Sequence, residues 1–182
     1  MPATEPPKRT PRRFLKEKSL VVVLFALLEA GDKGFAQFSS ILKGRPAEAL
    51  AVRDGAKHSA VNMAARYGNP RAVEALLAAG GDARNADVNG HTPIHHAVLS
   101  LAPNRKGPAR LGAPPPEAFG PAATRTIRAL LAAGADANAR DKNGATPLAL
   151  LRSARFAPTP EALKAGAAAE LQRARTGWVI GR

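Results

Sequence analysis

The chain has no cysteine, which excludes disulfide bonds, thiolate zinc sites and cysteine nucleophiles. Aromatic residues make up only 4% of the 182 residues, so the core cannot be built around large rings. Hydrophobic residues account for 45% of the chain and are mainly Ala, Leu and Val. Small side chains let helices approach closely, which favours helix-on-helix packing over a sheet sandwich.

Long hydrophobic runs are also missing. The best membrane candidate, residues 19–28, is half the length of a spanning helix, which needs about 20 apolar residues. It follows the basic stretch 12–16, but the twin-arginine export pattern is one residue short and no small-x-small cleavage site follows. We therefore expect a buried first helix and favour an intracellular location, with export as a bacterial protein kept as a minor alternative.

The net charge of +13 implies attraction to phosphates, anionic membranes or an acidic protein. Basic residues gather at the two ends and in one central segment, where they could contact an RNA backbone without reading its sequence. No aromatic residues are interleaved for base stacking, and the alternative is a purely solubilising role. The candidate phosphate contacts are Lys8, Arg9, Arg12, Arg13, Lys16, Lys18, Arg105, Lys106, Arg110, Arg173, Arg175 and Arg182.

The sequence repeats internally. Residues 54–64 align with 87–97 at an offset of 33, and a further copy begins 54 residues later, at 141. Residues 76–87 align with 130–141, again at an offset of 54. The third unit is therefore a 33-residue repeat that carries 21 extra residues (54 − 33 = 21). This insert, roughly 102–123, is rich in Pro, Gly and Arg and is predicted to be a loop.

Each unit has the signals of a helix pair. Thr92-Pro93 and Thr146-Pro147 combine an N-cap hydroxyl with a proline in the first helical position. Residues 73–77 and 127–131 carry the apolar stripe of a second helix, and a glycine follows each stripe as a terminator. Asp-x-Asn-Gly at 87–90 and 141–144 is turn chemistry. Such units cannot bury their apolar faces alone, so they must stack.

The segments 89–95 (NGHTPIH) and 130–141 (LLAAGADANARD) resemble the ankyrin repeat. The resemblance is clear over about 54–155, and 19–53 is a degenerate candidate for a first repeat. It implies an all-α ankyrin-repeat solenoid of three to four repeats with helical caps. The expected organisation is a basic tail (1–18), units at 19–53, 54–86, 87–140 and 141–157, and a capping helix with tail (158–182).

The resemblance also implies a binding surface, because ankyrin repeats bind partners with their turn tips and the exposed face of the first helix. The matching positions are Ala56, His58, Arg66, Tyr67, Val88, Asn89, His91, Leu99, Ser100, Lys142, Asn143 and Ala145. Tyr67 beside Arg66 has the chemistry of a binding hot spot. Lys57 replaces the turn glycine and Ser59-Ala60 replaces Thr-Pro, which predicts an irregular tip in that unit.

No catalytic constellation or phosphate-binding loop is recognisable, so we expect neither an enzyme, a cofactor nor a small-molecule substrate. His91, His95 and His96 form the metal-like group of the sequence. His95 occupies the position at which ankyrin repeats carry a structural histidine, and Asp87 is the nearby carboxylate. We therefore interpret these histidines as structural and predict no metal site.

The sequence thus predicts a non-enzymatic scaffold for protein–protein interaction that presents a concave ankyrin face to another protein with an acidic surface, or to a multi-subunit complex. The alternative is a structural subunit of a large ribonucleoprotein, such as an organellar ribosome, whose basic tails lie on RNA.

Overall fold

The computed structural model describes residues 12–102, 119–153 and 161–176. Within these ranges the chain forms helices and no β-strand, with one isolated bridge between Arg53 and Ser59. The predicted all-α class is confirmed. The helices are α1 (Arg12–Glu29), α2 (Asp32–Gly44), α3 (Pro46–Ala51), α4 (Ala60–Arg66), α5 (Pro70–Ala78), α6 (Pro93–Leu99), α7 (Phe119–Ala132), α8 (Pro147–Leu151) and α9 (Glu161–Arg175).

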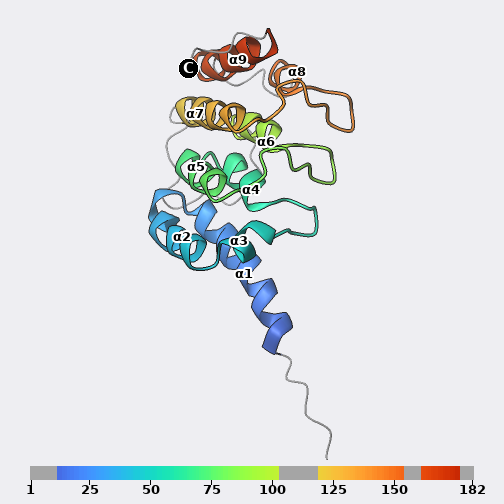
Figure 1. The fold of residues 1–182 in the computed structure, drawn as a ribbon. Helices are drawn as coiled ribbons and strands as arrows, with labels where there is room; N and C mark the ends of the chain where they lie inside the picture. The colour runs from blue at the N-terminus through green and yellow to red at the C-terminus, as the bar shows by residue number, and fades with distance from the viewer. Residues whose placement is uncertain (1–11, 103–118, 154–160, 177–182) are drawn as a thin grey trace, which may run out of the picture.

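The helices pack as a stack of pairs (Figure 1). Each pair consists of two helices in contact: α1 with α2, α4 with α5, α6 with α7, and α8 with α9. Contacts between pairs run along two rows, α1–α4–α6–α8 and α2–α5–α7–α9. Every pair therefore buries its apolar face against its neighbours, as the stacking argument requires.

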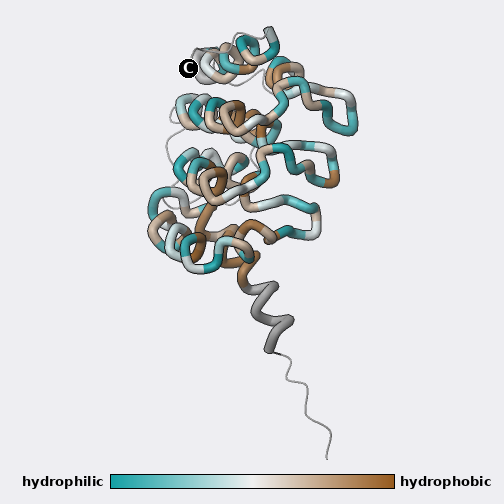
Figure 2. The backbone as a smooth tube through the Cα atoms, viewed as in Figure 1, coloured by the Kyte–Doolittle hydropathy of each residue, from teal (hydrophilic) through white to brown (hydrophobic). Residues whose placement is uncertain are grey.

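The core lies between the two rows of helices, and Figure 2 shows apolar stretches, in brown, within the helix pairs. Leu76, Ile94, Ile127 and Leu130 are completely buried, and most of them come from the predicted helical stripes. The small residues at the centres of α4 and α6, such as Ala97, are also fully buried. Their size lets neighbouring helices approach closely, which explains a core with so few aromatic rings.

The predicted caps are present. Thr146 Oγ1 accepts a hydrogen bond from Ala149 N–H, and Pro147 follows it at the start of α8. Ser59 caps α4 in the same way by accepting from Asn62 N–H, although no proline follows it. Within the segment 158–182, α9 begins at Glu161 and ends at Arg175.

Two boundaries differ from the expectation. Residues 12–18, assigned to the basic tail, are the first turns of α1, because no proline or glycine interrupts the chain between Arg12 and Gly31. Residues 119–123, assigned to the loop insert, belong to α7, whose Pro121 lies in the first turn where proline is tolerated. The rest of the insert, 103–118, lies outside the described residues.

The described side chains of α1, from Leu20 onward, are buried on one face of the helix. Leu24 and Leu28 of α1 are fully buried, whereas Val22 is 67% exposed. Along the described part of the chain, no helix combines the length and apolar character needed to cross a membrane.

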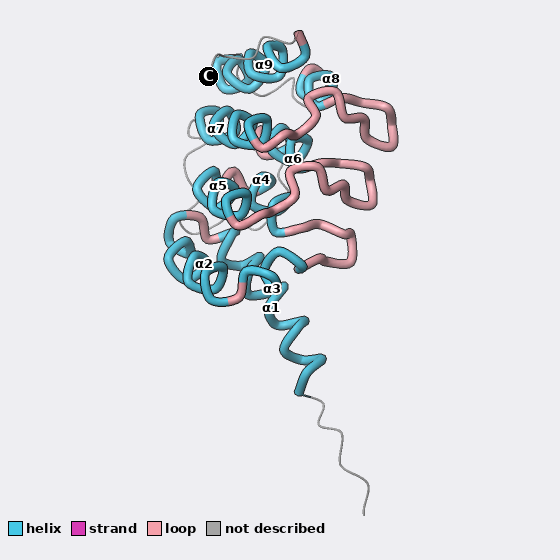
Figure 3. Tube along the Cα trace, in the orientation of Figure 1, coloured by secondary structure: helices cyan, strands magenta, loops and turns pink. Residues whose placement is uncertain are grey.

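Three long turns project from the same side of the stack (Figure 3). Each begins with an aspartate whose Oδ1 accepts two backbone N–H groups, from the residues two and four positions further on. Adjacent turns are also joined directly. Val88 N–H donates to Ala56 O at 3.0 Å, and Lys142 N–H donates to Asn89 O at 2.9 Å. The turns thus form a layer of their own, which we call the turn layer (residues 53–59, 84–91 and 138–145).

The tip at Lys57 is regular, contrary to the expectation. Lys57 has φ = 62°, close to the 78° and 77° of Gly90 and Gly144 at the matching positions. The Asp54 carboxylate holds this turn through the same two backbone bonds as in the other turns. Lysine therefore adopts a left-handed conformation that costs it conformational energy.

We predict that Lys57→Gly stabilises the protein by about 0.5 to 1 kcal/mol, because glycine adopts a positive φ without steric cost. Urea unfolding measures the change in the free energy of unfolding. The control is Lys57→Ala, which removes the charge and keeps the strained φ, and it should leave the stability unchanged. Equal stabilisation by both variants would show that charge repulsion, and not φ, is relieved.

Gly90 and Gly144 make a matched pair for testing how closely the turns are stacked. A Cβ at Gly90 would lie 3.0 Å from Lys142 N in the next turn, whereas a Cβ at Gly144 would meet nothing within 4 Å. Both substitutions by alanine impose the same positive-φ strain. We expect Gly90→Ala to destabilise the protein by about 1 kcal/mol more than Gly144→Ala, because the next backbone must shift. Equal losses in urea unfolding would contradict the close stacking.

Candidate functional site

All four histidines of the chain lie in or against the turn layer. His58 and His91 occupy matching positions in successive turns, each four residues after the aspartate that begins its turn. The third turn has Ala145 at this position. His95 and His96 lie in α6, behind the second turn.

The two turn histidines bridge successive aspartates. His58 lies between Asp54 (Nδ1–Oδ2, 2.7 Å) and Asp87 (Nε2–Oδ2, 3.3 Å). His91 lies between Asp87 (Nδ1–Oδ2, 3.6 Å) and Asp141 (Nε2–Oδ2, 3.4 Å). These five residues alternate carboxylate and imidazole across three turns, and we call them the turn-layer ladder. Each histidine thus links its own turn electrostatically to the next one.

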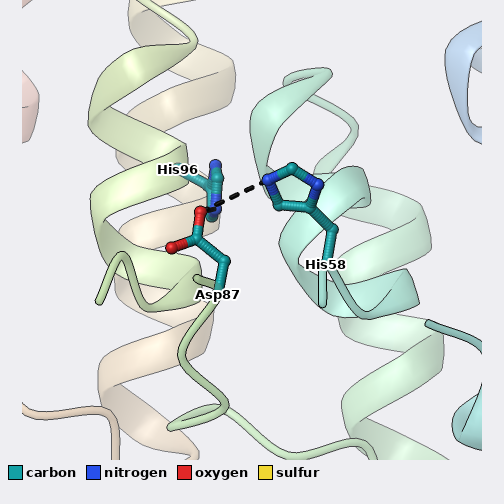
Figure 4. Close-up of side chains that lie close together, drawn as sticks. All are labelled: His58, Asp87 and His96. Atoms are coloured by element: carbon teal, nitrogen blue, oxygen red, sulfur yellow. Dashed lines mark hydrogen bonds and ion pairs between the residues drawn. The ribbon is translucent and has the colours of Figure 1, made fainter. Parts of the chain in front are cut away.

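His96 meets the ladder at its centre. Its Nε2 lies 3.2 Å from Asp87 Oδ2, so His58 and His96 approach the same carboxylate from two sides (Figure 4). The side chains of His96 and Asp87 are each only 1% exposed, whereas that of His58 is 18% exposed. The centre of the ladder is therefore a buried group of two imidazoles and one carboxylate, with His58 on its solvent side.

From the sequence, a different trio was considered as the metal-like group: His91, His95 and His96. His95 has the structural role that was predicted for it. Its Nδ1 accepts from Thr92 N–H at 3.2 Å, and its Nε2 lies 3.2 Å from the carbonyl oxygen of Ala145 in the next turn. The compact group is instead His58, Asp87 and His96, which offer one ligand atom each within 4.8 Å of one another.

Burial and hydrogen bonding set the charges of this group. Burial lowers the pKa of His96 to about 4, outweighing its hydrogen bond to Asp87. Burial alone would raise the pKa of Asp87, but the His96 side chain and the backbone N–H groups of His91 and Asn89 hold it far below its usual range. At neutral pH, Asp87 is an anion and His96 is neutral, so this buried pair carries a net negative charge.

The predicted binding residues fall into three groups. Val88, Asn89, Lys142 and Asn143 are exposed at the turn tips. Half-buried positions are Ala56, His58, Arg66, Tyr67, His91 and Ala145. Leu99 and Ser100 are buried, at 5% and 2% exposure.

The placement of Leu99 and Ser100 on an exposed face is therefore wrong. The helix that they end, α6, packs between α4, α7 and α8, which leaves its C-terminal turn no open side. Tyr67 also differs from a free hot spot, because its hydroxyl donates to Glu29 Oε2 at 3.3 Å and so ties α4 to α1.

The tip surface is basic. The turn aspartates point inward to backbone N–H groups and histidines, whereas Lys57, Arg140 and Lys142 are exposed. Lys57 and Arg140 were missing from the predicted surface. The signal that could have found them is the repeat alignment, which places all three in corresponding turns.

Of the candidate phosphate contacts, Arg173 and Arg175 are exposed on α9. Those at 12, 13, 16 and 18 lie on the first turns of α1. Lys8, Arg9, Arg105, Lys106, Arg110 and Arg182 lie outside the described residues.

Comparison with known proteins gives one partial similarity. The chain is 36% identical over 75 residues to the Neurogenic locus Notch protein of Drosophila melanogaster. The aligned stretch covers 41% of this chain and 3% of the Notch protein, so the similarity concerns a small part of that larger protein. No family model matches the chain.

The last carboxylate of the ladder allows a test of its electrostatics. Burial would raise the pKa of Asp141, but the N–H groups of Ala145 and Asn143 and the neighbouring histidines lower it overall. A lowered native pKa stabilises the fold fully above the ordinary value of 3.8, and this contribution is lost as the pH falls through the native value.

We expect Asp141→Asn to reduce the free energy of unfolding by about 1 to 2 kcal/mol at pH 7. Asparagine keeps the side-chain oxygen that holds the turn, so the variant removes mainly the charge. The difference from the wild type should shrink as urea unfolding is repeated at pH values falling from 5 to 3, roughly the range over which carboxylates protonate. A difference that is constant over this range would contradict an electrostatic origin.

Proposed function

We propose that the protein is a non-enzymatic, ankyrin-type interaction scaffold that binds an acidic surface of another protein with its turn layer. The observation that carries the proposal is the turn layer itself. Three turns project side by side from one face of the stack (Figure 3). Lys57 is exposed on the first turn, and Arg140 and Lys142 are exposed on the third, on either side of the uncharged Val88 and Asn89 at the tip of the middle turn. Electrostatic complementarity of this kind favours an acidic partner.

The turn layer has the rigidity that a binding surface needs. Backbone hydrogen bonds join each turn to the next, and the aspartates fix the conformation within each turn. A surface ordered before binding loses little conformational entropy in the complex, so more of the contact energy appears as affinity. The two rows of helices behind the turns hold them at a fixed spacing.

The ankyrin assignment rests on the repeat pattern, the stacked helix pairs and the similarity to Notch. The aligned 75 residues exceed two 33-residue units, so the similarity extends beyond a single motif. The assignment as a non-enzyme rests on the part that the ladder plays in the fold. Its carboxylates hold turns and its imidazoles join them, and both roles are structural.

The proposal predicts that reversing charge at the tips abolishes binding. The double variant Lys57→Glu and Lys142→Glu should lose the protein partner at least tenfold in co-purification from native cells, because a like charge then faces the acidic surface. The control variant, Arg173→Glu with Arg175→Glu, makes the same charge change on α9, where Arg175 donates to Asn138 at the start of the third turn and not to a residue at its tip. It should retain the partner.

Nuclease-treated and high-salt arms test the ribonucleoprotein alternative in the same experiment. A protein partner that survives nuclease and is lost only in the tip variant supports the proposal. Co-purifying RNA that depends on Arg173 and Arg175 and disappears with nuclease would instead favour RNA backbone binding. Circular dichroism of both variants verifies that they remain folded.

A further inference from the structure

The centre of the turn-layer ladder has the spacing of a metal site. His58 Nε2 and His96 Nε2 lie 3.3 and 3.2 Å from Asp87 Oδ2 (Figure 4). Zinc binds nitrogen and oxygen ligands at about 2.0 to 2.2 Å, which places neighbouring ligand atoms of a tetrahedron roughly 3.3 Å apart. The two distances to Asp87 therefore match the edge lengths of tetrahedral coordination, and all three ligand atoms lie within 4.8 Å of one another.

The hydrogen bond from His58 to Asp54 points to a positive group at this centre. His58 Nδ1 donates to Asp54 Oδ2 at 2.7 Å, so a neutral His58 directs the lone pair of Nε2 at the Asp87 carboxylate. Two acceptors at 3.3 Å repel each other unless a proton or a cation lies between them. A second imidazole nitrogen, from His96, converges on the same oxygen, and this arrangement suits one cation shared by three ligands.

We propose that His58, Asp87 and His96 bind a divalent transition-metal ion of the zinc class, which fastens the turn before α4 to the turn before α6 and to α6 itself. This inference departs from the sequence-based expectation of no metal site and does not depend on the proposed interaction surface. Imidazole ligands select zinc-like ions over Mg²⁺ and Ca²⁺, which prefer oxygen ligands.

The protonation states and the surroundings fit such an ion. Burial keeps His96 neutral and Asp87 is ionised at neutral pH, so the pair carries the net negative charge that a cation neutralises. Binding through His96 Nε2 moves the ring proton that this atom shares with Asp87 to Nδ1. Asp54 orients His58 in the way that a carboxylate orients a metal-binding histidine. His96 Nδ1 has no hydrogen-bond partner, so this second ligand lacks such support. We therefore expect affinity in the micromolar range, weaker than that of a structural zinc finger.

The partly exposed side chain of His58 gives the ion a route from solvent and leaves room for a water molecule as the fourth ligand. His91 approaches Asp87 at 3.6 Å but does not belong to the compact trio. His91 occupies the position in its turn that His58 occupies in the preceding one, and its side chain is equally exposed. It therefore serves as the control histidine, which zinc binding should not require.

The test is a calorimetric titration of the full-length, EDTA-dialysed protein with ZnCl₂ at pH 7.5, with a thermal melt at each end point. The proposal predicts one Zn²⁺ per chain, a raised Tm, and no response to MgCl₂ or CaCl₂. Titration with CoCl₂ should give the visible absorption of tetrahedral Co²⁺. His58→Ala should abolish the binding and the rise in Tm, whereas His91→Ala should retain both.

Asp54→Asn provides a second variant, because it keeps the oxygen that holds the turn and alters only the orientation of His58. It should weaken zinc binding about 10- to 100-fold while the protein stays folded. Absence of stoichiometric zinc binding by the folded wild type would overturn the proposal and favour a proton on His58 as the positive group. Binding that survives His58→Ala, or that Asp54→Asn leaves unchanged, would overturn it as well.

Discussion

The turn layer depends on three aspartates, each of which uses one carboxylate oxygen to hold its own turn and the other to contact histidine side chains. In each of Asp54, Asp87 and Asp141, Oδ1 accepts two backbone N–H groups and holds the turn in shape. Oδ2 remains available to imidazole groups, including those of a neighbouring turn. Local conformation and the coupling between units therefore depend on the same side chain, because a turn that lost its aspartate would lose both. The buried position of Asp87 is tolerable only because every one of these bonds is made.

This inward use of the acidic groups determines the outer surface. The chain has 14 acidic and 27 basic side chains. The aspartates that begin the turns bind backbone N–H groups and histidines within the turn layer. Lysine and arginine are exposed on the first and third turns, where the aspartates that begin those turns do not neutralise them at the surface. The inward position of the aspartates and the basic charge of these two tips are therefore two results of one arrangement.

Features with local causes could be predicted from the sequence, and features that depend on neighbouring units could not. The start of α8 at Thr146-Pro147 follows from capping chemistry within a few residues, and the burial of Leu76 follows from helical periodicity. Leu99 is buried in a helix, α6, that packs against α4, α7 and α8, so periodicity within α6 could not reveal its burial. The meeting of His58 with Asp87 and His96 depends on the spacing between turns. The repeated Asp-x-x-x-His pattern at 54–58 and 87–91 indicates that each turn has an aspartate and a histidine. Only the stacking of the turns shows that the histidine of one turn contacts the aspartate of the next.

The composition of the ladder follows from the same geometry. A bridging histidine needs one aspartate in its own turn and one in the next, so a row of three turns accommodates three aspartates and two histidines. This is the observed set: Asp54, Asp87 and Asp141 with His58 and His91. The third turn has Ala145 at the histidine position, and after it the chain continues into α8 and then α9. Within the residues that the structure describes no further turn of this kind follows, so a histidine at position 145 would have Asp141 in its own turn and no aspartate of a next turn to bridge. An alanine at this position agrees with a ladder that links successive units.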